Sequence, residues 1–234
     1  MNPRDLLPEI LFEDNHLMIV NKMPSQIVQG DKTGDEPLSG IIKEHIRIRD
    51  HKPGNVFLGV VHRLDRTVSG AVIFAKTSNA LSRLNLMLKN GEIRKTYWAV
   101  VKNPPREPEG HLIHYLTRNE QKNKSYAYEK PVENSKKAEL TFRVTGKSDQ
   151  YYLLEIKLLT GRHHQIRAQL SKTGSPIKGD VKYGFGRPNA DHSIHLHSRR
   201  IEFVHPVRKE EICIVADPPD DPVWNFFLKL QDKQ

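Results

Sequence analysis

Residues 57–75 read FLGVVHRLDRTVSGAVIFA, and no other stretch of the chain says as much about the fold. An apolar run stands at each end, and the second run, residues 71–75, is typical of a short buried strand. Between the runs, Arg63 and Arg66 stand on either side of Asp65. Charged groups between buried segments cost free energy unless they pair or serve a site. Composition alone favours a surface turn whose arginines balance one aspartate, and it leaves a functional site as the alternative.

The chain on either side of this stretch carries ordinary patterns of strands and helices. Within residues 10–20, two β-prone runs flank a turn-forming Asp-Asn pair and predict two short strands or one bent strand. Residues 37–49 space their apolar side chains as a short helix does. A second helix is predicted after the N-cap Thr77, with leucines on one face and Gly91 closing it.

The second half of the chain repeats this alternation. Strand patterns run through residues 95–101, 140–144, 151–159 and 194–204. Helices are predicted over residues 163–172 and after Asp221, where a proline takes the first helical position. Residues 117–137 are strongly polar and predict a solvated hairpin or mobile loop, whose lysines are also suited to contact phosphates. Without a repeat or long linker, residues 1–234 predict a single α+β domain with a mixed, largely antiparallel sheet and flanking helices.

Composition restricts the classes of partner and compartment. With 234 residues and a hydrophobic fraction of 37%, the chain is long and apolar enough for a packed core. Its formal net charge of +9 suits a polyanion such as nucleic acid, or an acidic membrane face. The single cysteine, Cys213, excludes an intramolecular disulfide, and the first residues form no apolar signal segment. No apolar run approaches the ~18 residues of a membrane-spanning helix, so we expect a cytoplasmic protein without a membrane partner.

The charged stretch resembles the His-Arg-Leu-Asp signature of the RluA-type pseudouridine synthases, here residues 62–65. Further blocks agree with that family in order and spacing. They are the opening block 11–22, the block RKTYWA at 94–99, the block LTGRHHQIR at 159–167, and the closing blocks at 176–184 and 196–206. The resemblance covers residues 10–206. It implies the pseudouridine synthase catalytic-domain fold, with no separate RNA-binding domain, and isomerisation of uridine to pseudouridine in RNA.

The resemblance also implies roles for particular side chains. Asp65 would be the essential carboxylate, Tyr97 the active-site tyrosine, and Arg167 the arginine that pairs with Asp65 and keeps it ionised. Arg63 would enter the space left by the flipped nucleotide. The remaining expected substrate contacts are His62, Leu64, Ile166, Lys22 and Arg162. For Lys22 and Arg162, as for Asp180, an architectural role is as well supported as a functional one.

The reaction explains why these residue types belong together. The N1–C1′ bond of uridine must break, the uracil must rotate while it is held, and C5 must bond to C1′. No electron or phosphate is transferred, so we expect no cofactor and no metal. A carboxylate serves either as nucleophile at the sugar carbon or as a base on a route through a glycal, and both routes remain open.

Two departures from the family pattern lie near the signature. Val68 stands where the family usually has threonine, and residues 23–25 lack the glycine that often follows the Asn-Lys pair. Neither departure removes a catalytic group. They bear on the positioning of the active-site loop and therefore on which uridine is chosen.

Two other classes of function compete with this interpretation. A metal enzyme is suggested by the histidine pair 163–164 and by His192, His195 and His197 near Asp191, although no cysteine or His-Glu-x-x-His motif accompanies them. A non-catalytic RNA-binding protein of the same fold is the other alternative, but loss of catalysis would have freed the catalytic positions to change. We expect a monomer that acts on ribosomal or transfer RNA.

Overall fold

The computed structural model describes residues 7–30 and 34–231. The chain divides into two compact units, and each is built from two separate parts of the sequence. The first unit comprises Met1–Ile93 and Ser198–Asp217, and the second comprises Arg94–His197 and Pro218–Gln234. In the described residues, no helix is long and apolar enough to cross a membrane. Each unit is considered in turn below.

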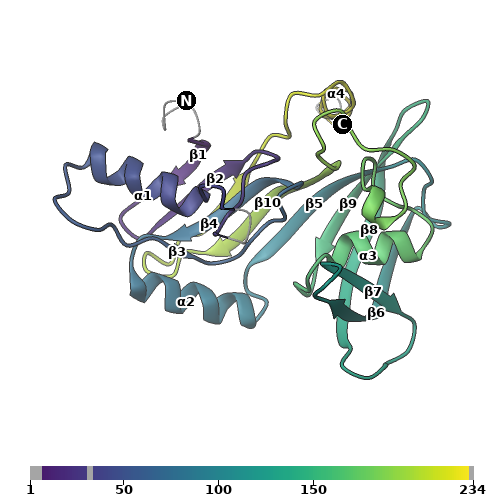
Figure 1. The fold of residues 1–234 in the computed structure, drawn as a ribbon, viewed down its shortest axis with the longest axis horizontal. Helices are drawn as coiled ribbons and strands as arrows, with labels where there is room; N and C mark the ends of the chain where they lie inside the picture. Colours follow the sequence, from purple (N-terminus) through teal and green to yellow (C-terminus); the bar gives the residue numbers. More distant parts are fainter. Residues whose placement is uncertain (1–6, 31–33, 232–234) are drawn as a thin grey trace. The chain divides into compact units, whose positions relative to one another are not determined.

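The first unit is a set of strands with two helices (Figure 1). Its elements are β1 (Glu9–Glu13), β2 (Leu17–Lys22), α1 (Leu38–Arg49), β3 (Gly59–Val60), β4 (Ser69–Ala75), α2 (Ser78–Lys89), most of β10 (Leu196–Val204) and β11 (Glu211–Val215). The strands run in the order β1-β2-β4-β10, with β3 paired to β4 and β11 to β10. The pairings of β1 with β2, β2 with β4, β3 with β4 and β10 with β11 are antiparallel.

Local side-chain contacts explain where these elements begin and end. The Asp14 carboxylate accepts hydrogen bonds from the N–H groups of His16 and Leu17, which closes the predicted turn between β1 and β2. The Thr77 side chain accepts from the Ala80 N–H and caps α2, and Gly91 follows that helix with a φ of 75°. Figure 1 shows α1 and α2 on opposite sides of these strands. The predicted elements of this unit are therefore confirmed.

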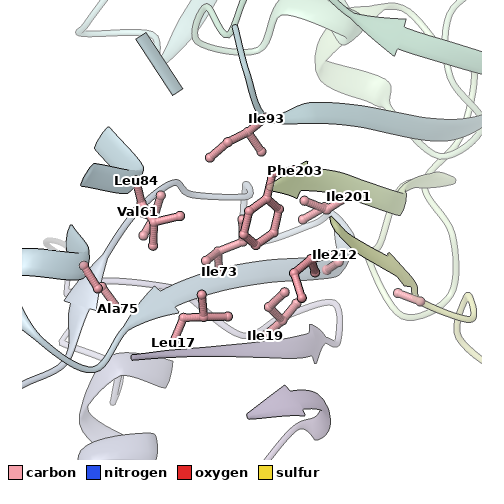
Figure 2. Close-up of a cluster of buried hydrophobic side chains, with 13 residues drawn as sticks. Leu17, Ile19, Val61, Ile73, Ala75, Leu84, Ile93, Ile201, Phe203 and Ile212 are labelled. Atoms are coloured by element: carbon pink, nitrogen blue, oxygen red, sulfur yellow. The ribbon is translucent and has the colours of Figure 1, made fainter. Parts of the chain in front are cut away.

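A buried hydrophobic cluster joins α2 to the strands of the first unit (Figure 2). Its buried members are Leu17, Ile19, Val61, Ala71, Ile73, Ala75, Ala80, Leu84, Ile93, Ile201, Phe203, Ile212 and Ala216. Alternate residues of β2 and β4 contribute to it, as expected for strands that bury one face against a helix. Val61, which directly precedes the charged stretch 62–65, is part of this cluster and anchors that stretch to the core.

The second unit consists of antiparallel strands in the order β5-β9-β8-β6-β7, with helices packed against them. Its elements are β5 (Arg94–Val101), β6 (Glu109–Asn119), β7 (Lys124–Tyr128), β8 (Lys136–Lys147), β9 (Tyr152–Leu158), α3 (Gln165–Lys172), the 3-10 helix η2 (Val181–Tyr183) and α4 (Pro222–Gln231). Within the polar residues 117–137, the end of β6 pairs with β7 to form a hairpin, which is one of the two predicted alternatives. The sequence pattern predicts no strand at residues 109–116 or 211–215, where most of β6 and all of β11 lie.

Two clusters hold the helices of the second unit in place. Trp224 and Phe227 of α4 pack with Trp98, Val100 and Leu153. Gly146 leaves room for this contact, because a Cβ atom there would lie 3.1 Å from Phe227. Ala168 of α3 belongs to a separate cluster, whose other buried members are Leu116, Ala138 and Tyr183. The helix predicted after Asp221 is confirmed.

Candidate active site

The signature segment is held against β4 where β3 ends. The Val61 N–H donates to the Ile73 carbonyl at 3.4 Å, and the Ile73 N–H donates to Nε2 of His62 at 3.2 Å. The imidazole of His62 therefore supplies the acceptor that a strand neighbour would otherwise provide. Beyond it, Arg63 is exposed, Leu64 is buried and Asp65 is half-buried. This alternation indicates that Arg63 and Asp65 project on the side opposite to Leu64.

Asp65 begins a tight turn that one other segment of the chain holds. The Val68 N–H donates to the Asp65 carbonyl at 3.0 Å, and the Ser25 N–H donates to the Arg66 carbonyl at 2.8 Å. Both departures from the family pattern lie at this turn. Val68 is buried, and Ser25 has a φ of 72°, in the left-handed region that glycine favours. The turn is thus held by the chain segment in which the family's glycine is missing.

Lys22 lies directly beneath this turn and is completely buried. Its ammonium group donates to the carbonyls of Val68 at 2.6 Å, Met23 at 3.0 Å and Arg66 at 3.3 Å. Burial lowers the pKa of Lys22 to about 7, while the negative charge of Asp65 raises that pKa. These bonds give Lys22 an architectural role in holding the turn. A contact with substrate stays a prediction.

Gly70 sets the exit of the segment into β4. Its φ is 113°, and a Cβ atom there would lie 2.4 Å from the carbonyl oxygen of Ser198 in β10. The register of β2 on β4 places Lys22 opposite Gly70. Only glycine allows the two backbones to approach this closely, so the glycine at position 70 has a structural reason.

The second unit holds the other residues for which the resemblance implied catalytic roles. Tyr97 lies in β5 opposite Ile156 of β9 and is 6% exposed. Ile166 and Arg167 lie in the first turn of α3, and both are buried. Arg162 is exposed, and its Nε donates to the Lys137 carbonyl at 3.0 Å. That bond fits the architectural interpretation of Arg162 without testing a role in substrate binding.

The loop that leads into α3 is fixed by the side chain of Gln165. Its amide oxygen accepts from the Thr160 hydroxyl at 2.7 Å and from the Arg162 N–H at 3.0 Å, and its amide nitrogen donates to the Glu139 carbonyl at 3.0 Å. His164 takes the left-handed conformation, with a φ of 51°. The helix therefore begins at Gln165, two residues later than the predicted start at residue 163.

The structure pairs Arg167 with Asp180, a contact that the sequence pattern does not predict. Its Nε donates to Oδ2 of Asp180 at 2.7 Å, and Nη2 donates to Oδ1 at 2.9 Å. The guanidinium carbon also lies 4.9 Å from the ring centre of Tyr183. The sequence showed a Gly-Asp turn here, but nothing in it indicated which cation that carboxylate meets. The predicted pairing of Arg167 with Asp65 stays a prediction.

Three histidines of the metal alternative have other partners. Nδ1 of His163 lies 2.9 Å from the Ser125 hydroxyl, and Nδ1 of His164 lies 3.0 Å from the Tyr183 hydroxyl. Nε2 of His195 lies 2.9 Å from the Asp221 carboxylate. Across residues 7–30 and 34–231, no group of three or more His, Cys, Asp or Glu side chains is placed to hold a metal ion.

Comparison with known proteins defines the class to which this fold and these residues belong. A family model described as RNA pseudouridylate synthase matches residues 16–172, a range that includes Asp65, Tyr97 and Arg167. The match covers more than half of the chain. The chain therefore belongs to the RNA pseudouridylate synthase family, and its resemblance to the RluA-type members is confirmed.

Individual relatives agree with this assignment. The chain is 35% identical over 233 residues to ribosomal large subunit pseudouridine synthase C of Buchnera aphidicola, covering 95% of this chain and 71% of that protein. It is 30% identical over 240 residues to ribosomal large subunit pseudouridine synthase D of Zymomonas mobilis, covering 97% and 74%. The activity of the present chain is that of an RNA pseudouridine synthase.

A solved structure shows the fold. Human RNA pseudouridylate synthase domain containing 4 superposes with a TM-score of 0.78 at 20% identity, over 96% of this chain and 94% of that one. The predicted α+β class, with the pseudouridine synthase catalytic-domain fold, is confirmed.

Proposed function

We propose that this enzyme isomerises uridine in structured ribosomal or transfer RNA and that Asp65 is its catalytic carboxylate. The observation that carries the proposal is the way the Asp65 turn is held. Lys22 donates to three carbonyls around it, and Ser25 and His62 attach its two sides to the fold. A half-buried carboxylate on a turn restrained in this way is positioned in advance of substrate binding, as an attacking or proton-accepting group must be.

The other residues complete the proposed mechanism. Asp65 acts either as nucleophile at C1′ or as base on the glycal route. Arg167 keeps the carboxylate ionised, and Tyr97 presents its ring to the uracil. Arg63 replaces the extruded nucleotide. His62, Leu64, Ile166, Lys22 and Arg162 complete the set of substrate-binding residues that we propose.

The choice of RNA rests on charge and on the relatives. A net charge of +9 favours binding to phosphates, and two similar proteins bear the name of ribosomal large subunit enzymes. We propose that the whole chain acts as one catalytic domain, as a monomer in the cytoplasm, without a cofactor. Mapping pseudouridine in cells with and without the protein tests the choice of target.

The catalytic assignment is tested by Asp65→Asn. The amide keeps the shape of the side chain but cannot supply a carboxylate, so we expect product formation to be lost while RNA affinity changes less than about tenfold. Asp50→Asn, an aspartate of the same unit at the end of α1, is the matched control and should keep full activity. Measurable turnover by Asp65→Asn would overturn the assignment.

A further inference from the structure

The ion pair of Arg167 and Asp180 in the second unit is almost completely buried. The side chain of Arg167 is 6% exposed and that of Asp180 is 1% exposed. Two parallel N–H···O bonds of 2.7 and 2.9 Å join them. A bidentate pair fixes the plane of the guanidinium as well as its distance, because both bonds must keep their geometry together. Removing one partner leaves an uncompensated charge out of water.

Asp180 is itself held by a turn that depends on glycine. Gly179 has a φ of 84°, and a Cβ atom there would lie 2.6 Å from the Asn189 amide nitrogen. The Asp180 N–H donates to the Ile177 carbonyl, and the Asp180 carbonyl accepts from the N–H groups of Tyr183 and Phe185. The backbone of Asp180 is thus tied on both sides. The position of the Asp180 carboxylate is therefore restricted by its backbone. We infer that the carboxylate determines the position of the Arg167 guanidinium, and not the reverse.

Tyr183 restrains the face of the same guanidinium. The ring centre lies 4.9 Å from the guanidinium carbon, a distance at which a cation is attracted to an aromatic face. The Tyr183 hydroxyl accepts from the Ser125 N–H at 2.8 Å and lies 3.0 Å from Nδ1 of His164. The ring is therefore anchored to β7 and to the loop before α3. One edge of the Arg167 guanidinium is hydrogen-bonded to Asp180, and one of its faces lies against the Tyr183 ring.

We propose that Asp180 is a positioning residue for the reaction: it sets the orientation of Arg167, and its effect on catalysis passes through that side chain. The inference rests on the proposed role of Arg167. Asp180 occupies two of the five guanidinium N–H donors and determines where the others point. Asp180 lies beyond residues 16–172, the range that matches the family model. Its role follows from the geometry of this chain.

A double-mutant cycle tests the proposal. The rate constant of the chemical step is measured in single turnovers at saturating enzyme for Arg167→Met, Asp180→Asn and the double variant, with RNA affinity and Tm in parallel. We expect Asp180→Asn to lower the rate about a hundredfold, as a misplaced catalytic group does. In the Arg167→Met background, the same change should alter the rate less than about twofold. Multiplicative losses in the double variant would overturn the proposal.

The outcome for Arg167→Met alone separates the two hypotheses. Near-normal rates for that variant would refute the proposed role of Arg167 itself. A large loss for Arg167→Met with a normal rate for Asp180→Asn would refute only the positioning role. Asp221→Asn is the matched control, because Asp221 is another aspartate of the second unit that is paired with a buried side chain. It should lower Tm and keep the rate.

Asp180→Glu keeps the test decisive if Asp180→Asn does not fold. The longer side chain preserves the charge and moves the carboxylate by about one methylene, so Tm should recover most of its value. If orientation is what matters, the single-turnover rate should remain at least about tenfold reduced. Full recovery of both Tm and rate would reduce Asp180 to a residue that only balances charge.

Discussion

Arg63 is the exposed member of the signature, between His62, which accepts a hydrogen bond from Ile73 of β4, and the buried Leu64. Its neighbour Leu64 points into the protein, so the alternation of an extended segment directs Arg63 and Asp65 to a common side. An enzyme that rebuilds a base bond must first extract the base from its stack. A long cationic side chain two residues from the proposed catalytic carboxylate is well placed to fill the space that the base leaves.

At this residue scale, Arg63→Ala should harm modification of a folded RNA more than that of an unpaired one. Unstacking and unpairing cost a few kcal/mol in a stem-loop and less in a single strand. Since every ~1.4 kcal/mol is a tenfold rate loss, the substrate-dependent difference in kcat/KM should be about tenfold or more. The measurement compares two RNAs that share the flanking sequence. Equal losses on both RNAs would make Arg63 a general phosphate contact.

At the scale of elements, the C-terminal helix α4 depends on one aspartate. Asp221 accepts from the N–H groups of Val223 and Trp224 and so caps the helix. The same oxygen lies 2.9 Å from Nε2 of His195. Because the Asn189 amide donates to Nδ1 of that ring, Nε2 carries the proton and donates to Asp221. The helix cap and the hydrogen bond to the buried imidazole therefore hold the start of α4 against the rest of the second unit.

The attachment of α4 should weaken in acid. The hydrogen bond from His195 lowers the pKa of Asp221 to about 2, against an ordinary value of 3.8. A carboxyl whose pKa is lower in the folded state adds stability above its unfolded pKa and loses it as the pH falls toward the folded pKa. Asp221→Asn keeps the cap but removes the charge. In urea unfolding, its deficit against wild type should be full near pH 6 and shrink between about pH 4 and 2.

His195 acts in the same direction. Burial lowers its pKa from the ordinary value of 6.5, so the unfolded state takes up a proton at a higher pH than the folded state does. The contribution of His195 to the stability of the folded state therefore also falls as the pH drops below about 6.5. A deficit of Asp221→Asn that stayed constant from neutral to acid pH would contradict the proposed attachment.

At the scale of the whole molecule, the positive net charge favours binding to RNA phosphates. The chain carries 37 Lys and Arg residues against 28 Asp and Glu. Several exposed lysines lie on or beside the β6–β7 hairpin, including Lys122 and Lys130. Each phosphate contact made by such a side chain releases counterions from the RNA. Affinity should therefore depend on salt even where the choice of uridine does not.

RNA affinity should fall steeply as salt is added. A plot of log K against log salt concentration should be linear, with a slope of roughly −0.7 per phosphate contact to single-stranded segments. If the hairpin contacts the RNA backbone, Lys122→Gln and Lys130→Gln should each weaken binding to all sequences alike and reduce the magnitude of the slope by about 0.7. A flat salt dependence would argue against phosphate contacts as the source of affinity.

Most elements were predictable because their signals are local. The strands 17–20, 71–75 and 95–101 and the helices after Thr77 and Asp221 follow from residue periodicity and cap residues a few positions apart. α3 starts two residues after the predicted position, because the hydrogen bonds of Gln165 and the left-handed conformation of His164 determine where the helix begins. The strands at 109–116 and 211–215 are not predictable from the local sequence, because the strand preference of a residue depends on what packs against each face of the strand.

By itself, the sequence determined the α+β class, the family and the set of candidate side chains, because motif order and periodicity are properties of the chain alone. Only the tertiary structure decided which partner each buried charged side chain binds. Arg167 is paired with Asp180, 13 residues away, and Lys22 with the Val68 carbonyl, 46 residues away. Such pairings depend on backbone turns at Gly179 and around Asp65. A buried charge takes whichever partner those turns bring within hydrogen-bond distance, and no spacing along the chain specifies it.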